Sequence, residues 1–181
     1  MRSGAFTEWE TPQDFYDALD REFCFTMDVC AIEENAKHHI YLSPKDDALS
    51  CSWGAVCWMN PPYDGQIGLW LEKAFRESQS GKTVVCLIQG RSTDTKWWHE
   101  YVMKASEIRF IKNRLHFGKN GIFKRANISS AVVVFLPFCQ GPPRISAINI
   151  QGDQISPKRN DNENQNLPPL PRPNSYGNSK A

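Results

Sequence analysis

The chain has 181 residues, a formal net charge of +1 and 40% hydrophobic residues, which is typical of one globular domain of ordinary size with a tail. No leader opens it and no apolar run approaches a membrane span, so we expect a cytoplasmic protein without a membrane partner. The six cysteines include no C-x-x-C pair, and the spacing of Cys30, His38 and His39 fits no common zinc pattern. We therefore expect reduced thiols and no metal site.

A helix is predicted near the start of the chain. Thr11 can cap it, Pro12 suits its first turn, and Phe15, Leu19 and Phe23 share one face. Further on, two amphipathic stretches predict helices at 67–79 and 96–105. Short apolar runs predict buried strands at 23–28, 55–59, 83–88, 107–111 and 131–136.

This alternation of strands and helices predicts an α/β fold with a mostly parallel sheet. A basic, hairpin-like connection joins the last two predicted strands, so we expect an antiparallel hairpin there. Ligands of such folds bind at the carboxyl ends of the strands, where Asp28 and Asn60 stand.

Charge is distributed unevenly along the chain. Residues 1–47 carry eleven acidic and four basic side chains, whereas residues 104–125 carry seven basic side chains and one acidic one. Two solvated faces of opposite sign would explain this pattern. A cationic surface for a polyanion would explain it equally well.

The composition changes at about residue 141. Residues 141–181 hold seven prolines and seven asparagines, so they cannot bury enough apolar surface to offset the entropy of ordering them. We therefore predict one domain at 1–140 and a disordered tail at 141–181. The LPPLPRP run in that tail is either a polyproline ligand or an ordinary linker segment.

The sequence Asn60-Pro61-Pro62-Tyr63 directly follows a predicted strand. An exocyclic amine or an amide is a poor nucleophile, and acceptors aimed at its N–H groups stabilise the charge that develops when it is methylated. The Asn60 side chain and the Pro61 carbonyl can be these acceptors, the prolines stiffen the turn, and Tyr63 offers a stacking face. The alternative is a strand-terminating turn without chemistry.

Asn-Pro-Pro-Tyr after a strand is the signature of amino methyltransferases that use S-adenosylmethionine. Residues 8–137 resemble the phage-type DNA N-6-adenine methyltransferases in WETPQDFYDAL, FTMDVCA, DDALSCSW, VCWMNPPY, GRSTDTKWWHEYV, IRFIKNRLHFG and SAVVVF, in that order. The resemblance implies a Rossmann-like methyltransferase fold and methyl transfer to the N-6 amine of a flipped-out adenine. It further implies double-stranded DNA as the partner and a phage or prophage origin in a bacterial host. The sequence makes no obligate protein partner evident.

The resemblance also implies roles for individual residues. Those for the cofactor fall in three segments: Thr11 and Pro12, then Asp28, Cys30 and Ala31, then Asp47 and Ala48. The first touches the methionine end of the cofactor, the second follows the first strand, and the third binds the cofactor's adenine. The usual glycine-rich loop is absent, because DVCAIEE stands where the family pattern reads like D-x-x-x-G-x-G. A helix cap or a solvated turn is the alternative role for the two acids.

A base must leave the duplex to enter such a pocket, so the protein needs contacts to the DNA backbone. The residues that we expect to contact DNA are Arg91, Thr93, Asp94, Trp97, Arg114, Lys119, Lys124 and Arg125. A solvated hairpin is the alternative for the basic connection from Arg114 to Arg125. One of the adjacent Trp97 and Trp98 should lie in the core, because neighbours on a helix point about 100° apart.

Other substrates and roles share these features. An RNA adenine or a protein glutamine presents the same chemical problem, although glutamine methyltransferases carry the glycine-rich loop and an extra N-terminal domain that this chain lacks. A catalytically inactive DNA-binding relative is the alternative outside the enzymes.

Overall fold

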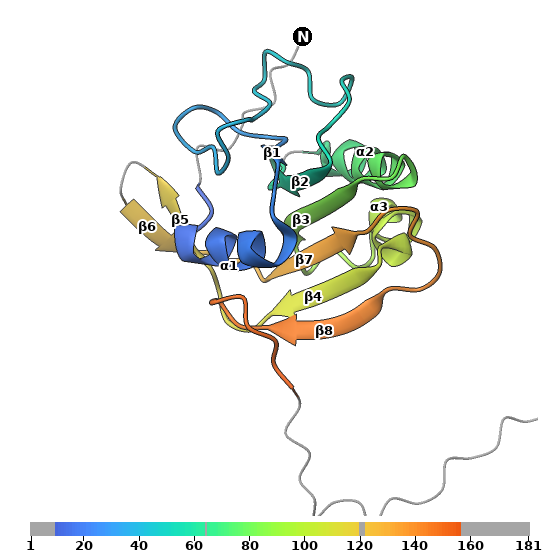
Figure 1. Cartoon of the computed structure of the whole chain (residues 1–181). Helices are drawn as coiled ribbons and strands as arrows, with labels where there is room; N and C mark the ends of the chain where they lie inside the picture. The colour runs from blue at the N-terminus through green and yellow to red at the C-terminus, as the bar shows by residue number, and fades with distance from the viewer. Residues whose placement is uncertain (1–9, 64, 120–121, 157–181) are drawn as a thin grey trace, which may run out of the picture.

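The computed structural model describes residues 10–63, 65–119 and 122–156 (Figure 1). A six-stranded sheet in the order β1-β2-β3-β7-β4-β8 forms its centre, and a two-stranded hairpin, β5-β6, lies beside it. The strands are β1 (Met27–Asp28), β2 (Val56–Met59), β3 (Thr83–Gln89), β4 (Glu107–Ile111), β5 (His116–Lys119), β6 (Ile122–Arg125), β7 (Ser130–Phe135) and β8 (Arg144–Ile148). The helices are α1 (Gln13–Phe23), α2 (Ile67–Gln79), α3 (Lys96–Glu100) and the 3₁₀ turn η1 (Val102–Lys104).

The sheet is mostly parallel, as the sequence predicts. β1, β2 and β3 pair in parallel, and so do β4 and β8, while β7 runs antiparallel between β3 and β4. The separate β5-β6 pair is antiparallel and confirms the predicted hairpin. Because β7 runs the other way, its first residue lies at the edge where β2, β3 and β4 end.

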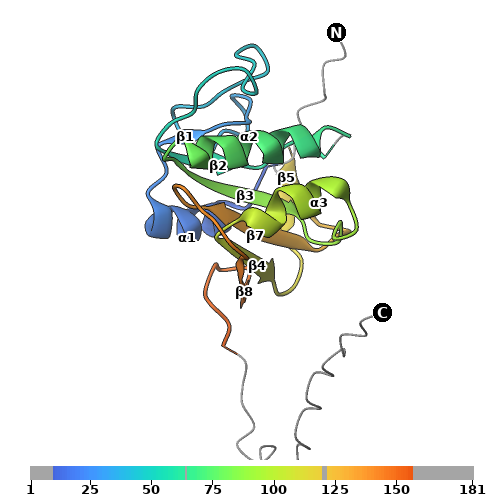
Figure 2. The same ribbon diagram turned by 90° about the vertical axis from the view of Figure 1, so that its right-hand side faces the viewer.

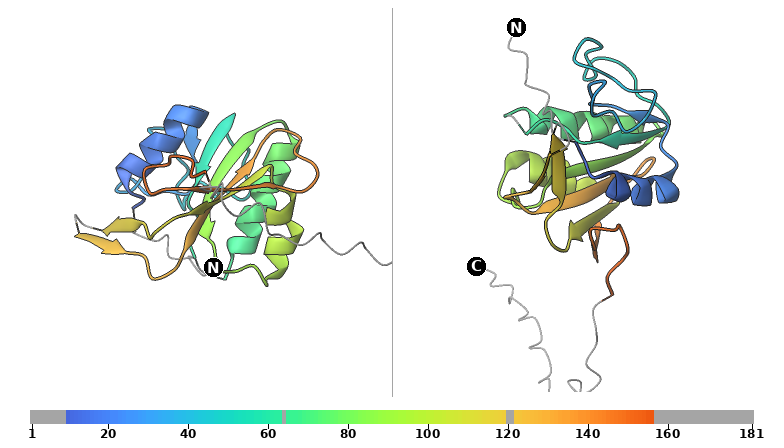
Figure 3. Two further views of the ribbon diagram at one scale, coloured as in Figure 1. Left: turned by 90° about the horizontal axis from the view of Figure 1, so that it is seen from below. Right: turned by 90° about the vertical axis from the view of Figure 1, so that its left-hand side faces the viewer.

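Helices cover both faces of the sheet: α2 and α3 lie on one side and α1 on the other (Figures 2 and 3). Successive strand residues point to opposite faces, so Cys57 and Met59 join the core under α2, whereas Trp58 joins the core under α1. Since both faces are covered, the central strands are continuous apolar runs rather than alternating ones. In β7, for example, every residue is buried.

The start of α1 differs from the prediction. Pro12 occupies the capping position and no side chain caps the helix. Thr11 is buried, and its hydroxyl instead accepts a hydrogen bond from the side chain of Asn60. The predicted strand at 23–28 is shorter too, because Cys24 takes a left-handed backbone conformation (φ 55°) and Phe25 turns into the core.

The far end of α1 is attached to the sheet by a buried arginine. The Arg109 guanidinium donates two hydrogen bonds of 2.6 Å to the carboxylate of Glu22 and one of 2.8 Å, through Nε, to Glu107. It also lies over the ring of Phe23, 5.2 Å from the ring centre. Arg109 was counted in the basic stretch of the sequence, but in the fold it joins a helix to the sheet.

The structure corrects the predicted start of the tail. Arg144–Ile148 forms β8, which pairs in parallel with β4, and Ile148 is fully buried beneath α1. Gly152 then packs against Ala18 of α1. Residues 141–156 therefore belong to the fold, because one short strand covers an edge of β4 that would otherwise be unpaired. The remainder of the predicted tail, 157–181, lies outside the described residues.

Candidate active site

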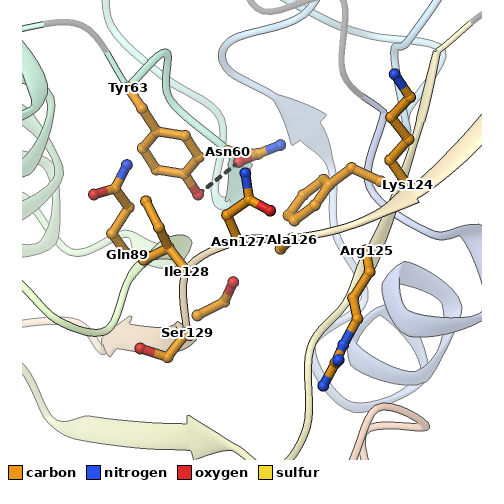
Figure 4. Close-up of a pocket in the computed structure, with 11 residues that line it drawn as sticks. Asn60, Tyr63, Gln89, Lys124, Arg125, Ala126, Asn127, Ile128 and Ser129 are labelled. Atoms are coloured by element: carbon orange, nitrogen blue, oxygen red, sulfur yellow. Dashed lines mark hydrogen bonds between the residues drawn. The ribbon is translucent and has the colours of Figure 1, made fainter.

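One edge of the sheet brings together part of the predicted site. Asn60 follows β2, Gln89 ends β3 and Ser130 begins β7, and the hairpin extends from the end of β4 at the same edge (Figure 1). These segments enclose a pocket of about 350 Å³. It is lined by Asn60, Tyr63, Gln89, Phe117, Lys124, Arg125, Ala126, Asn127, Ile128, Ser129 and Ser130 (Figure 4).

The side chain of Asn60 is held at both ends. Its Nδ2 donates to Thr11 Oγ1 at 3.2 Å, and its Oδ1 accepts from the hydroxyl of Tyr63 at 3.3 Å (Figure 4). The Tyr63 hydroxyl also lies 3.2 Å from the carbonyl oxygen of Leu87, a second acceptor for the same proton. Burial raises the pKa of Tyr63 above its ordinary value, so the hydroxyl keeps its proton.

Pro61 and Pro62, which follow Asn60, are buried. Proline has no N–H, and its ring fixes φ, so the turn presents carbonyl oxygens in a stiff arrangement. The site therefore offers acceptors, and among the residues that line the pocket the charged ones are Lys124 and Arg125. Those two side chains point in opposite directions from β6 (Figure 4).

Asp28, at the end of β1, closes its own loop. Its carboxylate accepts hydrogen bonds from the N–H groups of Cys30 (3.2 Å) and Lys37 (3.0 Å). Burial raises the pKa of Asp28 to about 6, and these two hydrogen bonds oppose the rise. The carboxylate thus stabilises the loop from inside.

The five backbone N–H groups of residues 28–32 all have acceptors within the protein. These are the carbonyls of Ile40, Trp58 and Leu42 and the side chains of Asp28 and Asn35. In this conformation residues 28–32 therefore have no free N–H group for an anion. A glycine-rich loop, by contrast, commonly binds an anion through free backbone N–H groups.

The other predicted cofactor residues lie in two places. Cys30 and Ala31 are buried, and the backbone N–H of Asn60 bonds the Cys30 sulfur, while burial raises the pKa of that thiol. Ala48 is buried in the same cluster as Cys30. Asp47 is exposed in a turn with φ 49°, where its carboxylate accepts a 2.6 Å hydrogen bond from the Ser50 hydroxyl.

The residues predicted to contact DNA are dispersed. Lys124 and Arg125 line the pocket, and Lys119 and the half-buried Arg114 belong to the hairpin and its approach. Trp98 is the tryptophan in the core. The other predicted contacts lie on the segment after β3, where Arg91, Thr93 and Asp94 are exposed and the half-buried Trp97 packs against Gly68 of α2.

Seven of the eleven residues that line the pocket were not predicted from the sequence. Gln89 is the last residue of β3, so the rule of strand carboxyl ends that selects Asn60 also selects it. The remaining missed residues are Phe117, Ala126, Asn127, Ile128, Ser129 and Ser130. They come from β5, from the connector between β6 and β7, and from the first residue of β7, and for these positions the sequence carries no comparable signal.

In the part of the chain that the structure describes, no helix is long and apolar enough to cross a membrane. Within the same residues, no three His, Cys, Asp or Glu side chains are grouped as a metal site requires.

Two comparisons with known proteins bear on this site. A family model described as DNA N-6-adenine-methyltransferase (Dam) matches residues 5–157, which includes β8. A protein of Haemophilus phage HP1 (strain HP1c1), named DNA N-6-adenine-methyltransferase, is 34% identical over 116 residues. That alignment covers 62% of this chain and 66% of the phage protein, just under two thirds of its length.

Proposed function

This chain belongs to the DNA N-6-adenine-methyltransferase (Dam) family, and on that premise we propose that it methylates the N-6 amine of an adenine flipped out of double-stranded DNA. The methyl donor in this proposal is S-adenosylmethionine. The enzyme would act in the cytoplasm of a bacterial host, as a phage or prophage product that needs no obligate protein partner.

The oriented amide of Asn60 is the observation that carries the proposal. Thr11 accepts from its nitrogen, so its oxygen faces the side of Tyr63 and the pocket. A carbonyl oxygen has two lone pairs, and Tyr63 occupies one of them. When an adenine enters, its N-6 amine can donate to the second, and the Tyr63 proton can turn to Leu87.

Methyl transfer then needs little more from the protein than positioning and electrostatic stabilisation. S-adenosylmethionine would supply the methyl group, and the N-6 nitrogen would carry positive charge as it accepts that group. Asn60 Oδ1 and the Pro61 carbonyl accept hydrogen bonds that strengthen as this charge develops. The charged amine loses a proton to solvent afterwards, so the pocket needs no strong base.

The residues near Asn60 fit the cofactor at one end. Thr11 uses a lone pair for Asn60 and retains its own proton, which it can donate to a carboxylate. Cys30, Ala31 and Ala48 are apolar and almost fully buried in this conformation. Thr11 and these three residues would hold S-adenosylmethionine, which would supply a methyl group on a cationic sulfur.

Phosphate contacts would come from the hairpin. Lys124 and Arg125 leave β6 in opposite directions at the mouth of the pocket, so one base can enter between contacts to the flanking backbone (Figure 4). A flipped base costs a few kcal/mol of lost stacking and pairing, and such contacts offset that cost.

A DNA-binding protein without catalysis is the second candidate. One observation favours it: the N–H groups of residues 28–32 are all bonded within the protein. A cofactor that depends on them would not bind this conformation.

Transfer of radiolabelled methyl from S-adenosylmethionine to unmethylated duplex DNA tests the proposal, with Asn60→Ala as the inactive variant. Gln151→Ala is the matched control, since it removes an exposed amide that does not line the pocket. The proposal expects label in N-6-methyladenine for the wild type and the control, and none for Asn60→Ala. Label on RNA or protein alone would overturn the DNA substrate, and DNA binding without cofactor binding would establish the second candidate.

A further inference from the structure

Lys37 is a buried cation that has no part in the proposed reaction. Its side chain is 2% exposed, and its Nζ donates to Glu10 Oε1 at 2.7 Å and to Gln13 Oε1 at 2.9 Å. Burying an ammonium group is costly unless it is paired and hydrogen-bonded. Here both conditions are met, and both partners belong to the short segment 10–13 before and at the start of α1.

Segment 10–13 contacts two parts of the pocket. The backbones of Glu10 and Gly118 exchange two hydrogen bonds, of 2.7 and 2.9 Å, so this segment pairs with β5 of the hairpin. Thr11 accepts from the side chain of Asn60 at 3.2 Å. Segment 10–13 thus contacts both the hairpin, which forms one wall of the pocket, and the side-chain amide of Asn60.

The other end of Lys37 is attached to the sheet. Its backbone N–H donates to the buried carboxylate of Asp28, and Asp28 pairs with Trp58 in the sheet. Lys37 therefore spans from the end of β1 to segment 10–13. The hairpin forms a sheet of its own, so its position relative to Asn60 depends on contacts such as those of segment 10–13 and Lys37.

We propose that Lys37 is a positioning residue for the pocket: from the buried side it fixes segment 10–13, which in turn places the hairpin through Gly118 and the Asn60 amide through Thr11. The inference rests on the proposed function for the role of Asn60. Its effect on the hairpin can be measured without any catalysis.

The test compares Lys37→Met with Lys37→Arg and with the control Lys45→Met, which changes an exposed lysine nearby in the chain. Methionine fills the space of the lysine stem. Glu10 is 40% exposed and Gln13 is exposed, so water can solvate both when the ammonium group is gone, and the fold should persist.

Hydrogen exchange of the Gly118 and Glu10 amides, measured without cofactor or DNA, is the first readout. In Lys37→Met we expect about tenfold faster exchange at these amides, while the amides of β3 and β7 exchange as in the wild type. The second readout is kinetic: KM for DNA should rise and kcat should fall. Lys37→Arg, which keeps the charge, should show hydrogen exchange and kinetics close to those of the wild type. Lys45→Met should change neither readout.

Unchanged exchange at Gly118 in Lys37→Met would overturn the proposal. Faster exchange throughout the protein, with a lower Tm, would also overturn it, since Lys37 would then support the fold in general. If the exchange responds as expected but the wild type methylates nothing, the link from Lys37 to the hairpin stands and the proposed function fails.

Discussion

The side-chain amide of Asn60 donates a hydrogen bond to the hydroxyl of Thr11, 3.2 Å away, although the two residues lie 49 positions apart in the chain. The Tyr63 hydroxyl donates to the other end of the same amide. A hydroxyl can donate as well as accept, so the two hydroxyls hold the amide in place from both ends. In the orientation that the structure shows, Oδ1 is the end that meets Tyr63.

Replacing Thr11 by valine should lower kcat for methyl transfer by about 10- to 100-fold, because the amide loses its fixed orientation while the volume of the side chain is kept. Thr11→Ser retains the oxygen and should keep most of the activity. Kinetics at saturating S-adenosylmethionine, together with a titration of cofactor binding, check this. A defect that vanishes at saturating cofactor would show that Thr11 serves the cofactor alone.

Neutralising the hairpin charges should weaken DNA binding. In Lys124→Gln and Arg125→Gln we expect lower affinity and a shallower dependence of log K on log salt, by about 0.9 for each lost phosphate contact. Arg76→Gln is the matched control, since Arg76 lies on α2 with its side chain 74% exposed. An unchanged salt slope in both hairpin variants would contradict the DNA surface proposed for β6.

Truncating Arg109 should destabilise the fold by about 2 to 4 kcal/mol, because Arg109→Met removes hydrogen bonds to two carboxylates in a buried setting. Arg144 pairs with Glu107 too, but its side chain is 67% exposed, so Arg144→Met should cost less than about 1 kcal/mol. Urea unfolding of the two variants measures the difference. Equal losses would show that burial does not strengthen the Arg109 contacts.

Asp28 should make stability depend on pH. Its pKa is about 6 in the fold and 3.8 in the unfolded chain, so between these values the folded state binds more protons. Its contribution is therefore full below about pH 4 and decreases as the pH rises to 6, by about 3 kcal/mol in all. The difference in unfolding free energy between wild type and Asp28→Asn, followed from pH 4 to 7, should show this decrease. A flat difference would mean that Asp28 does not titrate in that range.

Two glycines test how far the fold extends. Gly152 has φ 84°, and a Cβ there would lie 2.6 Å from the Cβ of Ala18, so Gly152→Ala should lose about 2 to 4 kcal/mol of stability. Gly141 has φ 87° and open space around it, so Gly141→Ala should cost only about 1 kcal/mol for the backbone. Thermal unfolding of the two variants separates the cost of the steric clash from the cost of placing alanine at a positive φ. Equal losses of stability in the two variants would show that residue 152 does not pack against α1.

The sequence predicts those parts of the molecule that depend on local pattern. Residues 67–79 form α2 with the predicted bounds, because the spacing of Leu71, Ala74 and Phe75 defines one buried face. Asn60 lies where a buried strand meets two prolines, and the structure places it at the carboxyl edge as expected.

What the sequence did not predict depends on contacts between distant segments. Thr11 has the residue type of a helix cap, but Asn60 engages its hydroxyl instead. β8 lies in a stretch rich in proline and asparagine, where composition averaged over many residues conceals five residues that pair with β4. The connector at 126–129 and the first residue of β7 reach the pocket only because β7 runs antiparallel, and no side-chain pattern reports strand direction.

That reversed strand has a consequence for how such a protein can diversify. β4 ends and β7 begins at the same edge, so everything between residues 111 and 130 is an excursion that leaves the sheet and returns to a neighbouring position. Its length and composition can change while every pairing in the central sheet is kept. Residues that line the pocket opposite Asn60 and Tyr63 belong to this excursion, so under the proposed function its changes would alter the pocket wall and leave the Asn60–Tyr63 turn in place.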